Sequence, residues 1–175
     1  MNTGQMMLTI AAMFMLSMVI LTANRGALTT STTMYESRYD ILGVSVANSI
    51  IEDATSLAFD KNSIGNNIDE FDELTSKDTL GLDNNENRNN PAGFNDFDDY
   101  NCYRTNPKLD TVQITGTTQR MMYSSYCRVD YVSANNPNTI SNDKTYHKKL
   151  TLKVFAPGMA DTLRMSTVYS YWYFR

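Results

Sequence analysis

Hydrophobic side chains fill the start of the chain without interruption. The eighteen residues from Met6 to Ala23 carry no charge, and their polar members are Thr9, Ser17 and Thr22. As an α-helix this stretch spans about 27 Å, close to the thickness of the hydrocarbon core of a bilayer. Because such a helix is apolar on every side, it needs lipid or other helices around it. The pattern predicts a transmembrane or packed helix over residues 6–23.

Beyond Ala23 the apolar positions recur at three- to four-residue steps. They are Leu28, Met34, Ile41, Leu42, Val46, Ile50, Ala54 and Leu57. This spacing is typical of an amphipathic helix that lays one apolar stripe on a sheet. We therefore expect one long helix over residues 5–59, about 80 Å in length.

Residues 60–101 have a different composition, in which Asn, Asp and Gly dominate and apolar residues are scattered. The segment predicts loop structure, with one short helical turn at residues 68–74. A loop of this length is usually a functional surface or is held in place by another part of the fold.

The remaining residues, 102–175, predict strands. Residues 112–117 form a weak candidate, whereas residues 121–132, 146–156 and 162–174 are rich in β-branched and aromatic side chains. In the second of these, Leu150, Leu152 and Val154 alternate with polar residues, which predicts one buried and one solvated face. The expected fold class is α+β, with a long N-terminal helix packed on an antiparallel sheet of three or four strands.

The charge is unevenly distributed along the chain. Residues 60–101 hold three basic and eleven acidic groups, whereas residues 102–175 hold ten basic and four acidic groups. The net charge of −4 and the lack of a clustered Arg/Lys stripe argue against nucleic-acid binding. No catalytic motif is present, and the sole histidine, His147, has lysines after it on a predicted strand. We expect no enzymatic activity.

Cys102 and Cys127 are the two cysteines of the chain. Beside an apparent membrane or export signal, they favour a disulfide, which would close a loop of about 25 residues and stabilise the fold by about 3.5 kcal/mol. The alternative is a pair of buried free thiols in a cytosolic protein.

The acidic segment offers one candidate metal site. Asp96, Asp98 and Asp99 lie close together in sequence, with Asn95 and Asn101 beside them. Carboxylate and amide oxygens are the ligands that calcium prefers, so Ca²⁺ is the candidate ion. An EF-hand does not fit residues 83–94, because Arg88 occupies the position that needs glycine.

Three interpretations of the N-terminus remain open. A cleaved secretory signal would need a basic start, which residues 1–5 lack. A signal anchor fits the length, although Arg25 lies on the unfavourable side for an exported C-terminus.

The third interpretation rests on a resemblance. A glycine at the end of a very short leader, followed by an apolar helix with a long amphipathic continuation, resembles a type IV pilin or pseudopilin. In that family a peptidase cuts after the glycine, which implies a leader of residues 1–4 and cleavage between Gly4 and Gln5. Thr9 then stands where major pilins have glutamate.

The resemblance implies a structural subunit of an extracellular filament, held in the inner membrane before assembly and then packed against copies of itself. Other pilin-like subunits and an assembly machinery are the implied partners. The residues that would form the filament core are apolar members of the first helix, namely Met6, Leu8, Ile10, Phe14, Leu16, Val19 and Leu21.

Two other functions stay open. The chain could be a membrane-anchored extracytoplasmic binding domain with a calcium or ligand site in the acidic loop. It could also be a secretion-system pseudopilin that does not reach the cell surface.

Overall fold

A computed structural model describes residues 2–84, 86–88, 90–104, 111–113 and 120–174. The chain divides into two units, a helical segment that ends at Arg38 and a head that begins at Tyr39. One helix, α1 (Thr3–Ser56), runs through both. The expected helix over residues 5–59 is thus confirmed, with its start two residues earlier and its end three residues earlier.

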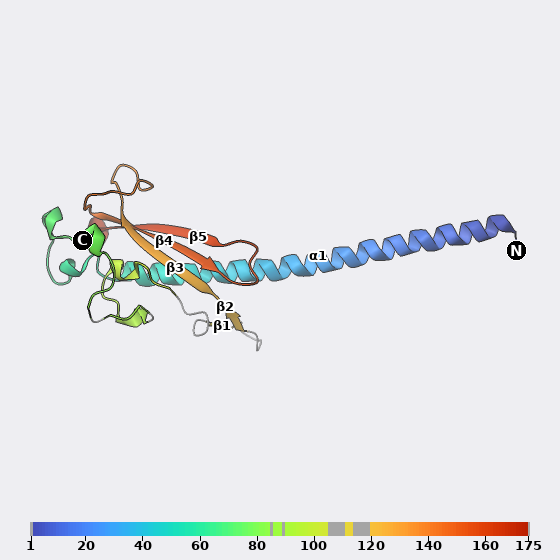
Figure 1. Cartoon of the computed structure of the whole chain (residues 1–175), viewed down its shortest axis with the longest axis horizontal. Helices are drawn as coiled ribbons and strands as arrows, with labels where there is room; N and C mark the ends of the chain where they lie inside the picture. The colour runs from blue at the N-terminus through green and yellow to red at the C-terminus, as the bar shows by residue number, and fades with distance from the viewer. Residues whose placement is uncertain (1, 85, 89, 105–110, 114–119, 175) are drawn as a thin grey trace. The chain divides into compact units, whose positions relative to one another are not determined.

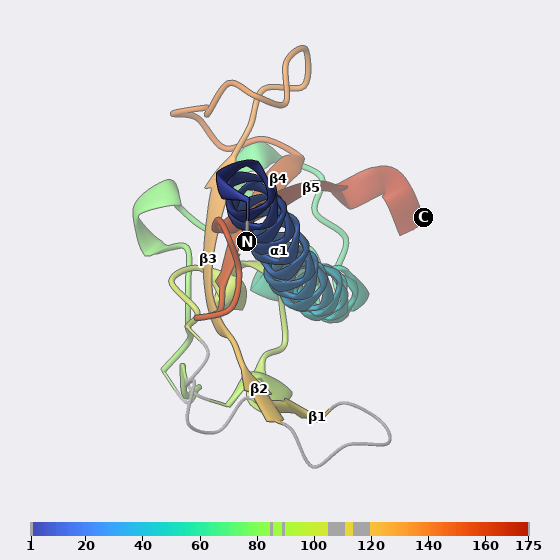
Figure 2. The same cartoon turned by 90° about the vertical axis from the view of Figure 1, so that its right-hand side faces the viewer.

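The head contains a three-stranded antiparallel sheet in the order β3-β4-β5 (Figure 1). The strands are β3 (Ser124–Tyr131), β4 (His147–Phe155) and β5 (Leu163–Ser170). In the register of the sheet, Leu152 of β4 lies between Cys127 and Met165. Strands β1 (Thr111–Gln113) and β2 (Arg120–Met122) form a separate two-stranded ladder, which Figure 2 shows beyond the end of β3.

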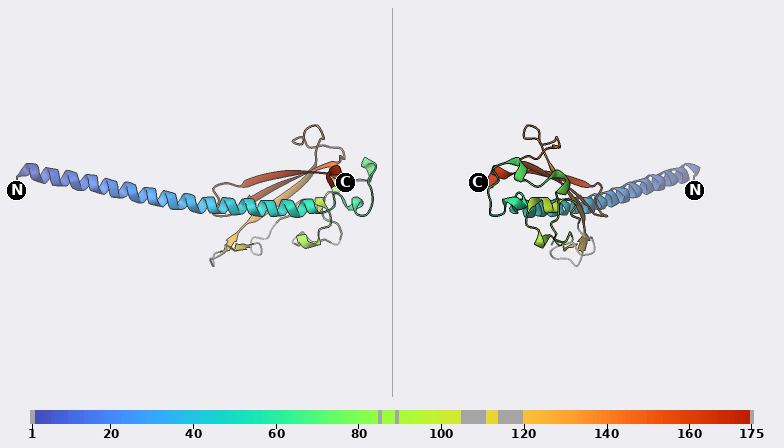
Figure 3. Two further views of the ribbon diagram at one scale, coloured as in Figure 1. Left: turned by 180° about the vertical axis from the view of Figure 1, so that it is seen from behind. Right: turned by 60° about the vertical axis from the view of Figure 1, so that its left-hand side comes forward.

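The C-terminal part of α1 packs on one face of this sheet, as seen from behind in Figure 3. Its buried residues are small or aliphatic and recur at helical spacing: Gly43, Ala47, Ile50 and Ala54. Small side chains let the helix approach the sheet closely, and a Cβ at Gly43 would lie 3.1 Å from Cε of Met159. The alternation expected for β4 is confirmed, because Leu150, Leu152 and Val154 are fully buried. The fold is α+β, as predicted.

The segment from residue 57 to 101 contains short 3₁₀ helices and, among its described residues, no strand. The 3₁₀ helices are η1 (Lys61–Ser63), η2 (Phe71–Glu73), η3 (Lys77–Thr79), η4 (Pro91–Gly93) and η5 (Phe97–Tyr100). The helical turn expected within residues 68–74 is therefore present as η2. Apolar side chains from this segment form a second core cluster with Tyr131 of β3; they are Phe59, Ile68, Leu74 and Leu80.

The predicted strands differ from the structure in their bounds, by one residue at each end for β4 and by more for the others. The strand expected over residues 121–132 is interrupted at Tyr123, whose hydroxyl donates to the carbonyl of Tyr39 on α1 at 3.0 Å. The strand expected over residues 162–174 ends at Ser170 and continues as the 3₁₀ helix η6 (Tyr171–Phe174). There the Tyr171 hydroxyl accepts a hydrogen bond from the amide of Ile68 at 2.8 Å, which connects η6 to the segment from residue 57 to 101. Of the strand expected over residues 112–117, residues 112 and 113 lie in β1, and the rest lie outside the described residues.

We predict that Leu152→Ala lowers the free energy of unfolding of the head by about 2–5 kcal/mol, because it leaves a cavity between α1 and the sheet. The matched control is Lys153→Ala on the exposed face of the same strand, with an expected change within about 0.5 kcal/mol. Urea unfolding of the full chain in detergent measures both. Equal destabilisation by the two variants would contradict this packing.

Candidate functional site

The first candidate site is the surface of α1 between Met6 and Ala23. Every residue of this stretch is exposed, including Leu8 at 73% and Phe14 at 69%. The residues placed in a filament core from the sequence all lie on this surface; they are Met6, Leu8, Ile10, Phe14, Leu16, Val19 and Leu21. Gly4 and Gln5, at the expected cleavage site, lie in the first turn of the helix. Their roles in processing and assembly stay predictions.

The polar side chains in this stretch satisfy their own hydrogen bonds. The hydroxyls of Thr9, Ser17 and Thr22 donate to backbone carbonyls of the preceding turn at 2.8–2.9 Å. The pattern continues beyond Ala23, where the hydroxyls of Thr29, Thr30, Thr32 and Thr33 do the same. A polar group that bonds to its own backbone costs little to transfer into an apolar environment. The helix surface is therefore suited to lipid or to another helix.

By length and composition, α1 is long and apolar enough to cross a membrane, and it is the one such helix among the residues that the structure describes. None of its most apolar stretch is buried within the chain.

The second candidate site is a buried cluster around Lys148. This lysine lies on β4 in phase with Leu150 and Leu152, and its side chain is fully buried. Its Nζ donates to the carbonyl of Phe59 at 2.8 Å and to Oδ2 of Asp60 at 2.9 Å. A third hydrogen bond goes to Oδ1 of Asp98. The rings of Phe59 and Tyr131 flank the ammonium, with centroids 4.7 and 5.5 Å from Nζ.

Asp60 is held rigidly beside Lys148. Its carboxylate accepts from the amide and hydroxyl of Thr75, both at 3.0 Å, and from the amide of Asn62 at 3.1 Å. Burial alone would raise the pKa of Asp60, but the charge and hydrogen bond of Lys148, with these backbone donors, hold the pKa below its usual value. Asp60 is therefore ionised in the folded head.

Asp98 differs from Asp60 in its electrostatic environment. Burial raises the pKa of Asp98 above its usual value, and the lowering effect of Lys148 does not cancel this rise. The two carboxyl groups that contact one ammonium are thus unequal: Asp60 favours the ionised form and Asp98 favours the neutral form more than an ordinary aspartate.

The structure gives the predicted calcium ligands other partners. Oδ1 of Asp96 accepts from the amides of Asp98 and Asp99, which caps η5. Oδ2 of Asp99 accepts from the amides of Asn95 and Asp96, at 2.8 and 3.0 Å, and Asp98 pairs with Lys148. Among the described residues no group of three or more acidic, histidine or cysteine side chains converges as a metal site. The three carboxylates thus serve backbone caps and the pair with Lys148, and the calcium site expected at Asp96, Asp98 and Asp99 stays a prediction.

The expected disulfide is also absent, since Cys102 and Cys127 are free thiols. The backbone of Cys127 bonds to both Cys102 and Tyr103, at 3.0 Å each. Tyr103 occupies the place in the core beside Cys127, whereas Cys102 has a φ of 62°, outside the extended region, and is half-buried. Burial raises the pKa of the Cys127 thiol to about 12. Lys148 thus connects the acidic segment to the sheet through Asp60 and Asp98, without a bond between the two sulfurs.

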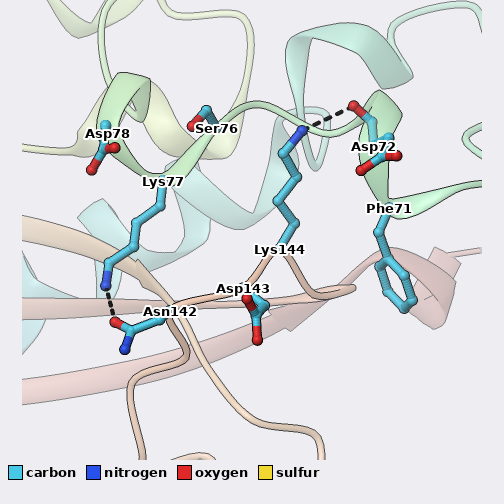
Figure 4. Close-up of a pocket in the computed structure, with 8 residues that line it drawn as sticks. All are labelled: Phe71, Asp72, Ser76, Lys77, Asp78, Asn142, Asp143 and Lys144. Atoms are coloured by element: carbon cyan, nitrogen blue, oxygen red, sulfur yellow. Dashed lines mark hydrogen bonds between the residues drawn. The ribbon is translucent and has the colours of Figure 1, made fainter.

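A polar cleft of about 550 Å³ lies between the η2–η3 region and residues 142–144 (Figure 4). Two lysines bridge it: Lys144 Nζ donates to the carbonyl of Asp72 at 2.9 Å, and Lys77 Nζ donates to Oδ1 of Asn142 at 2.7 Å. The lining mixes both signs of charge, with Phe71 as its aromatic member.

Neither Lys148 nor its partner Asp60 was predicted as a site residue from the sequence. The signal was present, because the two-residue period of β4 places Lys148 on the same face as Leu150, Leu152 and Val154. A lysine in phase with a buried face needs an acidic partner, and the acidic segment upstream supplies two.

Comparisons with known proteins leave the family open: no family model, no curated protein and no solved structure matches this chain.

We predict that Lys148→Met destabilises the head by about 3–5 kcal/mol, because Asp60 and Asp98 would remain buried without their cation. Lys149→Met, one residue away on the other face of β4, should change stability by about 0.5 kcal/mol or less. Chemical unfolding of the full chain in detergent compares them. An unchanged transition in Lys148→Met would show that the ion cluster does not hold the fold.

We predict that Asp96→Asn flattens the pH dependence of stability. Burial, followed by the charges of Asp98 and Asp99, raises the pKa of Asp96 to about 9. Since an unfolded aspartate has a pKa of about 3.9, the folded head holds a proton that the unfolded chain loses, so stability decreases as the pH rises from about 4 to 9. Asparagine keeps the cap but does not titrate.

The measurement is urea unfolding at about pH 5 and about pH 8.5. On going to the higher pH, the free energy of unfolding of Asp96→Asn should increase relative to that of wild type by about 1 kcal/mol or more. Asp143→Asn, an exposed aspartate, is the control and should follow wild type. Parallel curves for wild type and Asp96→Asn would contradict the prediction.

Proposed function

We propose that this protein is a structural subunit of a type IV pilus-like filament, which assembles by packing its apolar helix against the helices of other copies. The observation that carries the proposal is an uncharged helical surface of eighteen residues, exposed on all sides, whose hydroxyls bond to their own backbone. The protein would be held in the inner membrane before assembly and lie in an extracellular filament afterwards.

The apolar surface extends further than a membrane requires. About 20 residues span the hydrocarbon core, yet exposed apolar side chains continue after Ala23, including Leu28 at 69%, Met34 at 55% and Ile41 at 70%. In an anchored monomer these side chains would face water. In a filament they would face neighbouring subunits, which favours assembly over simple anchoring.

The composition of the helix also supports close helix packing. Transfer of a helix from lipid into a bundle gains little hydrophobic energy, so association depends on van der Waals contact between closely approaching backbones. Ala11, Ala12 and Ser17 supply small exposed side chains within the apolar stretch.

One observation favours a second function. The polar cleft bridged by Lys77 and Lys144 in the head could take a ligand, as a membrane-anchored binding domain would require. A secretion-system pseudopilin would share the helix and the head and differ in where its polymer ends.

We predict that Leu28→Asp abolishes filaments without releasing the protein from the membrane. Leu28 lies beyond the apolar stretch of residues 6–23, so insertion into lipid should persist, whereas a carboxylate buried between subunits without a partner is costly. The control, Asn136→Asp, makes the same charge change at an exposed head position. Electron microscopy of sheared surface material should show filaments for wild type and the control, and at least tenfold fewer for Leu28→Asp.

N-terminal mass spectrometry of the same material should find Gln5 as the first residue. A wild-type protein that stays in the membrane as a monomer and keeps Met1 would overturn the proposal in favour of the anchored binding domain. Polymers confined to the cell envelope would identify the secretion-system pseudopilin.

A further inference from the structure

The Lys148 cluster brings an amine and two carboxyl groups into direct contact where no solvent reaches them. The side chains of Lys148 and Asp60 are fully buried, and that of Asp98 is 2% exposed. Two aromatic rings, from Phe59 and Tyr131, flank the ammonium. The geometry therefore keeps Nζ of Lys148 against the carboxyl group of Asp98 and shields both from competing water.

The two carboxyl groups have the different roles that amide formation needs. Asp60 is an ionised acceptor for a proton from the lysine, and its Oδ2 lies 2.9 Å from Nζ. Hydrogen bonds from Thr75 and Asn62 hold its carboxylate in place. Burial raises the pKa of Asp98, so its site favours the neutral form more than that of an ordinary aspartate, and in that form the carboxyl carbon is open to attack by an amine. A neutral amine beside a neutral acid is the reactive pair.

The energetics favour the reaction in this position. A buried ion pair keeps a desolvation cost that an uncharged amide does not carry. Holding the reacting groups in contact converts a bimolecular condensation into an intramolecular one, with effective molarities of about 10⁵–10⁸ M for well-oriented groups. The released water leaves for bulk solvent, which opposes the reverse hydrolysis.

We propose that Lys148 and Asp98 condense into an intramolecular isopeptide bond, with Asp60 as the catalytic proton acceptor. Asp60 takes a proton from the ammonium, and the free Nζ lone pair attacks Cγ of Asp98. The Nζ–Cγ bond forms, and the bond from Cγ to the hydroxyl oxygen of the neutral acid breaks. That oxygen departs as water, with its own proton and one from the amine. Asp60 ends neutral with the remaining proton, so an amide and a water replace an ion pair and no oxidant or cofactor is consumed.

The bond would link η5, in the segment from residue 57 to 101, covalently to β4 of the sheet. It would close a loop between residues 50 positions apart, in the part of the head where the expected disulfide is not formed. Unfolding could then no longer separate the two segments.

The test is the mass of the full wild-type chain under denaturing conditions, compared with that of Lys148→Arg from the same host. Wild type should be lighter than its sequence mass by one water molecule, and Lys148→Arg should show no deficit. Tandem mass spectrometry of a digest should find a branched peptide that joins Asp98 to Lys148. Lys149→Arg is the matched control and should keep both the deficit and the branched peptide.

Asp60→Asn separates catalysis from proximity. It keeps a hydrogen-bonding side chain of the same size beside Lys148 but removes the proton acceptor, so the linked fraction should decrease at least tenfold in freshly made protein. An equally fast and complete linkage in Asp60→Asn would overturn the role of Asp60. A wild-type chain at its full sequence mass, or a water loss that maps to any other residues, would overturn the bond itself.

Discussion

The uncovered surface of α1 is the constraint on which the rest of the molecule depends. Between Met6 and Ala23 the helix presents apolar side chains on every side, and the described part of the chain buries none of them. Water cannot solvate such a cylinder at low cost, so lipid or further helices must cover it. The same helix then changes character, because from Gly43 to Ala54 it buries one narrow face of small or aliphatic residues against the sheet.

The head depends on a second interaction, the burial of Lys148 between Asp60 and Asp98. The segment from residue 57 to 101 has no regular ladder, among its described residues, to attach it to the sheet. Part of its attachment is made by the ammonium of Lys148 on β4, which bonds to Asp60 and Asp98. The Tyr131 hydroxyl, which donates to the carbonyl of Thr75, and the contact of the Phe59 ring with Tyr169 add to it. An acidic segment whose composition suits a metal ion here uses its carboxylates to organise its own backbone.

The sequence was sufficient to predict the elements whose pattern is local. An uncharged run indicated the first helix, a three- to four-residue period indicated its continuation, and alternation indicated the buried face of β4. It was insufficient where contacts between distant segments decide. The alternation of β4 indicates that Lys148 is buried, but its partners could not be predicted, because they are 50 and 88 residues away in sequence. The disulfide was expected from a pair of cysteines beside an apparent membrane or export signal, whereas the pairing of the backbones puts Tyr103 in the core beside Cys127.

The central claim is that the apolar surface of α1 packs against the same surface of other copies. Its most direct test is photocrosslinking from a reactive group placed at the position of Met13, in material taken from the native cell without detergent. We expect covalent dimers and higher oligomers, with bonds that map to residues 6–23 of a second copy. Adducts with lipid alone, under conditions in which the protein is fully assembled, would contradict the claim.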